Sequence, residues 1–353
     1  MTTTTIDRRS LLRNSSTLGI IAATGAIGAS AIAGIDTLAQ STTTPTIATA
    51  TPDTPGLDRR KRLRERLKAR RAARAARAAT SITPTHADIP YVTDGTPQQV
   101  LDVYLPTTTD AAGTPVPATA GAAGASVPVV IWIHGGGWVG GDKRGGGVPY
   151  LLDDGYAIVS INYRLLQDAM FPAQIVDANA ALTWVWHHAE TYGFDRSRIV
   201  VAGGSAGGRS ASLVAASAND GVEAFTPDSD VRIAALIDFF GGTDGKRAFE
   251  KNARRKALIE SHLTQEQIDA MLQMIDVRTY VDAGDPPTLI VHGDQDTTVP
   301  IVESQELAVA MKAAGVNVTF ETMPGRGHGM IHYQDAAVQE IVRTFLRDTL
   351  GPA

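Results

Sequence analysis

The sequence predicts an α/β fold over residues 80–353, with a mainly parallel central sheet flanked by helices. Short apolar runs rich in Val and Ile alternate there with longer helix-like stretches, which is typical of strands joined by crossover helices. The 353 residues are 43% hydrophobic, enough for one large core in a single catalytic domain. The predicted strands are 100–105, 128–134, 156–163, 198–202, 233–240, 288–292 and 317–322, and the predicted helices are 172–192, 302–314 and 335–350.

The first 39 residues have the parts of an export signal: a basic start, a run of small apolar residues and a small-residue cleavage site. Arg8 and Arg9 resemble a twin-arginine signal, although Asp7 departs from the hydroxyl residue usual before the pair. We therefore expect an exported protein, periplasmic or extracellular. A retained membrane anchor is the alternative, which the glycines in the run and Asp36 near its end disfavour.

Two segments of biased composition precede the catalytic domain. Residues 40–56 are rich in Thr and Pro and are predicted to be a linker. Residues 57–79 contain eleven Lys and Arg among Ala and Leu, a composition that favours a basic helix. We expect either a solvated spacer or a segment that contacts an anionic surface of the cell envelope.

Charge and cysteine content exclude several kinds of function. Residues 80–353 contain 18 basic and 32 acidic residues, which argues against nucleic acid as a partner, because phosphate binding needs clustered positive charge. The chain has no cysteine, so disulfides, thiolate nucleophiles and Cys-ligated zinc are excluded. No motif implies a metal or an organic cofactor.

A candidate nucleophile lies at a glycine-rich turn after a predicted strand. Gly203-Gly204-Ser205-Ala206-Gly207 matches the pattern G-x-S-x-G and opens a helix of small residues. Gly203 and Gly207 remove side-chain bulk where strand and helix pass closely. The turn places the Ser205 hydroxyl at the carboxyl end of the strands, where open α/β sheets bind ligands. Ser205 is therefore the predicted nucleophile.

A second glycine-rich turn, His134-Gly135-Gly136-Gly137-Trp138, follows another apolar strand. Glycine-rich backbone can direct two amide groups at an oxyanion without obstruction, and we assign these donors to Gly136 and Gly137. A third amide is expected from Ala206, the residue after the nucleophile. Trp138 is expected to shape the substrate pocket. These glycines also match the dinucleotide fingerprint G-x-G-x-x-G, but further glycines follow where that motif requires a helix.

The nucleophile needs a base and an acid that orients the base. His328 lies in a loop after the last predicted strand, and the loop after the preceding strand offers Asp294 and Asp296. We choose Asp296, because it lies deeper in the loop. The chain order Ser205, Asp296, His328 is the α/β-hydrolase order and differs from those of chymotrypsin-like and subtilisin-like proteases.

From about residue 90 to residue 350, the chain resembles the bacterial esterases related to hormone-sensitive lipase and to feruloyl and acetyl-xylan esterases, the BD-FAE type. The resemblance implies an α/β-hydrolase fold with a small cap insertion, and the triad and oxyanion hole assigned above. The sequence departs from the family at Arg209, where histidine is frequent, and at Gly242, where proline is frequent; both departures are expected to alter the pocket. The runs that carry the resemblance are His134 to Trp138, Asn162-Tyr163-Arg164, Phe171-Pro172-Ala173-Gln174, Gly203 to Gly208, His292 to Pro300, and Gly327-His328-Gly329.

The expected activity is carboxylic ester hydrolysis of a small-molecule ester through an acyl-enzyme on Ser205, without cofactor or metal. Short acyl esters or small aromatic or sugar esters are expected, because the first half of the insertion 242–285 is strongly charged and predicts a fairly open site. One alternative is a peptidase resembling the prolyl-oligopeptidase group, which normally carries a large additional N-terminal domain. The other is a surface-binding protein that acts through residues 57–79.

Overall fold

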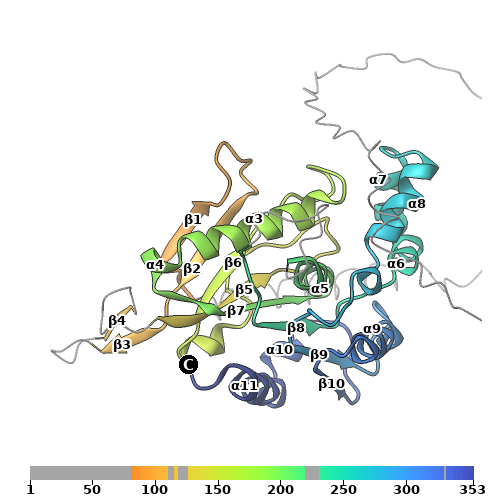
Figure 1. Ribbon diagram of the computed structural model, residues 1–353. Helices are drawn as coiled ribbons and strands as arrows, with labels where there is room; N and C mark the ends of the chain where they lie inside the picture. The colour runs from red at the N-terminus through yellow and green to blue at the C-terminus, as the bar shows by residue number, and fades with distance from the viewer. Residues whose placement is uncertain (1–81, 110–114, 118–125, 219–229, 330) are drawn as a thin grey trace, which may run out of the picture. The chain divides into compact units, whose positions relative to one another are not determined.

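The computed structural model describes residues 82–109, 115–117, 126–218, 230–329 and 331–353. The predicted export signal, linker and basic segment, residues 1–39, 40–56 and 57–79, lie outside these ranges and stay predictions. The described residues form an eight-stranded sheet in the order β1-β2-β6-β5-β7-β8-β9-β10, with helices on both faces (Figure 1). The predicted α/β-hydrolase fold is confirmed.

Neighbouring strands pair in parallel along the part of the sheet that runs β6-β5-β7-β8-β9-β10. At the other edge, β1 pairs antiparallel with β2, and β2 pairs antiparallel with β6. The edge strand β1 was not predicted, because its sequence His86-Ala87-Asp88-Ile89-Pro90 has little apolar content and ends at a proline. A separate hairpin of β3 (Thr107–Thr109) and β4 (Pro115–Pro117) was also not predicted. The main sheet consists of β1 (His86–Pro90), β2 (Val100–Tyr104), β5 (Val127–Ile133), β6 (Ala157–Ile161), β7 (Phe194–Gly204), β8 (Ala235–Phe239), β9 (Thr288–Gly293) and β10 (Val318–Met323).

The helices follow the predicted pattern, except that the helix expected over 172–192 is divided at His188. Three short helices, α6, α7 and α8, lie between β8 and β9 and form the cap. The helices are α3 (Ala173–His187), α4 (Ala189–Tyr192), α5 (Ala206–Ala218), α6 (Gly245–Lys251), α7 (Ala253–Glu260), α8 (Gln265–Met274), α9 (Ile301–Ala314), α10 (Ile331–Gln334) and α11 (Ala336–Leu350), with 3-10 turns η1 (Pro149–Leu152) and η2 (Val277–Thr279).

The sheet is buried on both faces, as its continuous apolar strands require. On β5, Val129 and Ile131 belong to one core cluster, together with residues of α3, α5 and α9. Val130 and Trp132 belong to a second cluster, together with residues of α11, which lies on the opposite side of the sheet from α3 (Figure 1). Because parallel strands end at one edge, the loops after β5, β7 and β9 emerge close together.

The cap buries apolar side chains, which differs from the expected open site. A capping box of Thr264 and Gln267 begins α8. Charged and apolar residues share this segment at helical spacing, so they lie on different faces of the helices. Phe249, Ile259, Ile268 and Met271 are buried, whereas Lys246, Lys251 and Arg254 are exposed. Within the described ranges, no helix is long and apolar enough to cross a membrane.

A buried carboxyl group, Asp238, lies at the end of β8 beneath the glycine-rich turn of Ser205. Its Oδ1 accepts a hydrogen bond of 2.8 Å from Gly241 N, and its Oδ2 accepts one of 3.3 Å from Ser212 Oγ. Burial raises the pKa of Asp238 to about 6, although the hydrogen bond from Gly241 N opposes this shift. The folded state therefore binds a proton there more tightly than the unfolded state.

We expect Asp238→Asn to raise the free energy of unfolding at about pH 8. The pKa of this carboxyl group is near 4 in the unfolded protein and near 6 in the folded protein. Between these two pH values the free energy of unfolding of the wild-type protein falls as pH rises, because the buried group becomes ionised; the total loss is at most about 3 kcal/mol. Asparagine stays neutral and can accept the Gly241 hydrogen bond. Urea unfolding of both proteins should show a difference at about pH 8 that shrinks towards pH 4. A variant less stable than wild type at pH 8 would contradict this account.

Candidate active site

Ser205 lies between the last residue of β7 and the first residue of α5, in a strained backbone conformation. Its φ is 59°, in the left-handed region that costs a non-glycine residue about 1–2 kcal/mol. Two backbone hydrogen bonds hold it there: Ser205 N donates to Phe239 O at 2.9 Å, and Arg209 N donates to Ser205 O at 3.0 Å.

The neighbouring glycines are required because β7, α5 and β5 approach closely. A Cβ on Gly203 would lie 2.3 Å from Gly207 O, and a Cβ on Gly207 would lie 2.0 Å from Ile133 O. Both separations are shorter than any real Cβ contact. Any side chain at either position would therefore displace the turn that carries Ser205.

The structure brings the predicted nucleophile, base and acid together. His328 Nε2 lies 2.8 Å from Ser205 Oγ, and His328 Nδ1 lies 2.7 Å from Asp296 Oδ2. Because a carboxylate only accepts, Nδ1 carries the proton, and Nε2 is left to accept from the serine hydroxyl. Asp294, the other carboxylate of this loop, is exposed and accepts instead from Gly325 N at 2.7 Å.

Asp296 is held as a buried carboxylate. Its Oδ1 accepts from the backbone N–H groups of Thr298 and Val299 at 2.8 and 2.9 Å. Burial by itself would raise the pKa of Asp296, but hydrogen bonds from His292, His328 and Val299 N hold it well below its usual range. Asp296 is therefore ionised at neutral pH.

A second histidine contacts the same carboxylate, and the sequence did not predict it as a site residue. His292 Nε2 lies 3.2 Å from Asp296 Oδ2 and 3.0 Å from Val299 O, and both of these oxygens can only accept a hydrogen bond. The Nε2 therefore carries a proton, and Nδ1 accepts from Ser304 Oγ at 2.7 Å. The only sequence signal was the His292-to-Asp296 spacing, because this contact depends on how the loop after β9 turns back.

The predicted oxyanion loop lies directly against Ser205. A Cβ on Gly135 would lie 3.3 Å from Ser205 Cβ, and Gly136 and Gly137 have φ values of 126° and 66°. In the described part of the chain, the amides of Gly136, Gly137 and Ala206 donate no hydrogen bond to another protein group. Ala206 N lies in the first turn of α5, where helix geometry provides no acceptor.

The run Asn162-Tyr163-Arg164 supports this loop from below. Tyr163 OH donates to His134 O at 2.8 Å, and the two rings stack with centroids 4.4 Å apart. Asn162 Oδ1 accepts from Lys143 N at 2.7 Å, further along the same glycine-rich loop. These contacts hold the backbone that presents Gly136 and Gly137.

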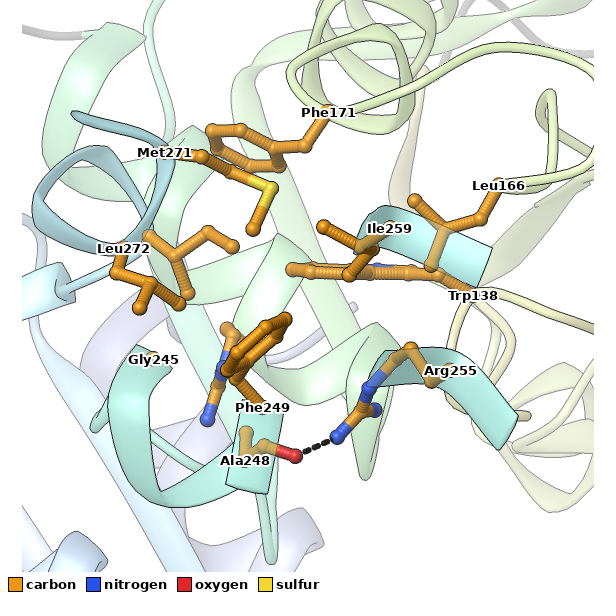
Figure 2. Close-up of a pocket in the computed structure, with 12 residues that line it drawn as sticks. Trp138, Leu166, Phe171, Gly245, Ala248, Phe249, Arg255, Ile259, Met271 and Leu272 are labelled. Atoms are coloured by element: carbon orange, nitrogen blue, oxygen red, sulfur yellow. Dashed lines mark hydrogen bonds between the residues drawn. The ribbon is translucent and has the colours of Figure 1, made fainter. Parts of the chain in front are cut away.

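Trp138 lines a pocket between the glycine loop and the cap. The pocket has about 310 Å³ of empty space, including space open to solvent. Figure 2 shows the Trp138 indole facing Phe249, Ile259 and Met271 of the cap. Its Nε1 donates to Ser210 Oγ at 3.0 Å, which ties the pocket to the helix that begins after Ser205. The pocket is therefore mainly apolar and borders α5, and Ser205 and His328 are not among the residues that line it.

The two positions at which the sequence departs from its family contact each other. Arg209 is buried, and its Nε donates to Gly242 O. A Cβ on Gly242 would lie 2.6 Å from Arg209 Nη2 and 2.7 Å from Glu303 Oε2. Burial lowers the pKa of Arg209 to about 10, although Glu303 opposes the shift, so the arginine stays charged at neutral pH. A side chain at 242 would therefore have to displace the ends of the Arg209 and Glu303 side chains.

No cluster of three or more His, Cys, Asp or Glu in the described residues is arranged to hold a metal ion.

Comparison with known proteins places this geometry among esterases. The chain is 30% identical over 243 residues to the esterase LipC of Mycobacterium tuberculosis, covering 66% of this chain and 57% of the relative. It is 34% identical over 187 residues to the probable carboxylic ester hydrolase LipM of the same organism, covering 50% and 43%. The matches thus span about half the length of these relatives.

Solved structures with related sequences share the fold. Esterase B of Lactobacillus rhamnosis, solved with a tributyrin phosphonate inhibitor, is 27% identical with a TM-score of 0.63, over 80% of this chain and 92% of that one. A bifunctional GH43-CE protein of Bacteroides eggerthii is 30% identical with a TM-score of 0.60, over 74% of this chain and 38% of that one.

Family models agree with these likenesses. Residues 272–353 match the model of TAP-like proteins, a second α/β-hydrolase model that covers the segment with Asp296 and His328. Residues 117–311 match the BD-FAE model, which covers more than half of the chain and includes the glycine loop, Ser205 and Asp296. This chain belongs to the BD-FAE family of the α/β-hydrolase fold.

Proposed function

We propose that this protein is a serine carboxylic ester hydrolase that acts through an acyl-enzyme on Ser205. The observation that carries the proposal is the continuous hydrogen-bonded series from Ser205 Oγ through His328 to Asp296, at 2.8 and 2.7 Å. It lies beside three backbone amides that donate no hydrogen bond within the described residues. Named esterases among the related proteins support the same activity.

In acylation, Ser205 Oγ attacks the ester carbonyl carbon while His328 Nε2 takes the hydroxyl proton. Asp296 accepts from Nδ1–H and stabilises the imidazolium that forms. The amides of Gly136, Gly137 and Ala206 donate to the oxygen on which negative charge develops. When the tetrahedral intermediate collapses, the bond to the alcohol oxygen breaks and His328 gives that oxygen its proton.

In deacylation, a water molecule takes the place of the alcohol. His328 Nε2 removes a proton from the water as the water attacks the acyl carbon, and then returns a proton to Ser205 Oγ as the carboxylic acid leaves. Because the pKa of Asp296 is held low, Asp296 stays ionised throughout. His292, which donates to the same Asp296 oxygen, keeps the acid in place as a positioning residue.

We further propose that the pocket beneath Trp138 accepts one short substituent of the ester. Phe249, Ile259 and Met271 of the cap bound this pocket opposite Trp138, and side chains that close a pocket leave little room for a long chain. The C4 inhibitor named for the Lactobacillus rhamnosis esterase supports a short acyl chain.

Ser205→Ala should lower kcat/KM for 4-nitrophenyl acetate by roughly 10⁴-fold or more, because no other group replaces the nucleophile. The wild-type protein should be labelled by a fluorophosphonate probe and the variant should not. Equal thermal midpoints would show that the fold is intact. Turnover by the variant near the wild-type rate would refute the nucleophile, and faster cleavage of a matched 4-nitroanilide than of the ester would indicate a peptidase.

Asp296→Asn should lower kcat by roughly 10³-fold, because an amide cannot hold Nδ1–H and stabilise the imidazolium in the same way. Asp294→Asn is the matched control in the same loop, and it should change kcat by less than about threefold, since asparagine can still accept from Gly325 N. Steady-state kinetics of both variants decide the identity of the acid. A larger loss in Asp294→Asn would assign the acid to the other carboxylate.

In a series of 4-nitrophenyl esters from C2 to C16, acetate and butyrate should be cleaved with higher kcat/KM than palmitate. Methylenes beyond the pocket stay in water and gain none of the roughly 0.8 kcal/mol that burial provides. Met271→Phe should shift the preference to shorter chains, whereas Met274→Phe, on the same helix but not among the residues that line the pocket, should not. A maximum at C12 or longer would show a lipase-like groove.

A further inference from the structure

The cap helix α7 places one arginine beside the oxyanion loop. Asn252 Oδ1 accepts from Arg255 N at 3.0 Å and so begins the helix. The side chain reaches back to the loop, where Arg255 Nη1 lies 3.6 Å from the position that a Cβ on Gly137 would take. Arg255 Nη2 donates to Ala248 O, which fixes the guanidinium at the pocket wall (Figure 2).

The other buried or partly buried arginines of this region have carboxylate partners. Arg209 lies 3.5 Å from Glu303, and Arg247 lies 3.9 Å from Glu303 and 3.7 Å from Asp244. Among the described residues, no carboxylate oxygen lies within 4.0 Å of the Arg255 guanidinium. Among the residues that the structure describes, the pocket therefore contains one cation with no carboxylate in ion-pair contact.

The surroundings of Arg255 make this charge costly. Trp138, Phe249 and Ile259 line the same pocket, and burial lowers the pKa of Arg255 by disfavouring the charged form. A partly buried cation without an anion loses hydration that a single backbone carbonyl does not replace. Binding an anionic group would recover that energy.

We propose that Arg255 binds a carboxylate group of the substrate, so that the preferred esters are anionic. The inference rests on the proposed ester hydrolysis and adds the substrate class. A guanidinium presents two parallel N–H donors that match a carboxylate, and a hydrogen bond between two charged groups is stronger than a neutral one. Residues 80–353 carry an excess of 14 negative charges, so the local cation of Arg255 is needed to admit an anion.

The carboxylate can belong to either half of the ester, and two pairs of substrates separate these sources. The acyl arm compares 4-nitrophenyl hydrogen adipate with 4-nitrophenyl heptanoate, which lacks the charge at similar length. The alcohol arm compares 4-acetoxybenzoate with 4-acetoxybenzamide. In one of the two arms, wild-type kcat/KM should favour the anionic ester by about 10- to 100-fold.

Arg255→Gln should abolish this preference, so that kcat/KM for the anionic ester falls about 10- to 100-fold more than kcat/KM for its neutral counterpart. Arg255→Lys should keep part of the preference, because lysine retains the charge without the fork. Arg254→Gln is the matched control: this neighbour is exposed and is not among the pocket residues, so its removal should leave the preference unchanged. Thermal midpoints establish that each variant is folded.

Equal use of anionic and neutral esters by the wild-type protein in both arms would overturn the inference while ester hydrolysis stands. An equal loss of kcat for both members of each pair in Arg255→Gln would also overturn it and assign Arg255 to the oxyanion instead. If no ester is cleaved, the proposed function fails, and calorimetry then decides the inference separately. Benzoate should bind the wild-type protein more tightly than benzamide does. Benzoate should also bind the wild-type protein more tightly than it binds Arg255→Gln, and equal binding in these comparisons would refute the carboxylate site.

Discussion

The close passage of β7, α5 and β5 is the constraint on which the rest of this site depends. A Cβ on Gly207 would lie 2.0 Å from Ile133 O, so the helix after Ser205 begins almost in contact with the neighbouring strand. The chain can turn from β7 into α5 only through a left-handed residue, and Ser205 takes that place at φ 59°. This strained conformation costs roughly 1–3 kcal/mol. Backbone hydrogen bonds on both sides of the turn hold Ser205 in it, and the conformation sets the direction of the hydroxyl.

The acid side of the site follows a different principle, in which a buried charge is stabilised by a full set of donors. Asp296 accepts from two backbone amides and two histidines, so its ionised form survives burial. His292 is itself oriented by Ser304, which means that α9 takes part in placing the carboxylate. The hydrogen-bonded series that ends at Ser205 therefore begins outside the loop that carries Asp296.

Charge in the pocket is distributed unevenly. Arg209, Glu303 and Gly242 form one compact unit, because the guanidinium fills the space that a side chain at 242 would need. Arg255 lies outside this unit and has no such partner in the described residues. The cap thus presents an apolar surface and the Arg255 guanidinium next to the oxyanion loop. The apolar surface suits the uncharged part of the proposed substrate, and the guanidinium suits its carboxylate.

The order of the main strands and helices, and the glycine-rich turns that include Ser205, were determined by the sequence alone, because each depends on neighbouring residues. An apolar run specifies a buried strand, and a glycine marks backbone that no side chain fits. The edge strand β1 was missed because its five residues lack that apolar signal. Only the tertiary structure decided which of Asp294 and Asp296 meets His328, that His292 shares the same carboxylate, and that Arg255 reaches Gly137. Asp294 and Asp296 have the same chemistry and lie two residues apart, and His328 and Ser205 are separated by 123 residues. Such contacts depend on the directions in which folded loops and helices point their side chains, and no local pattern of residues specifies these directions.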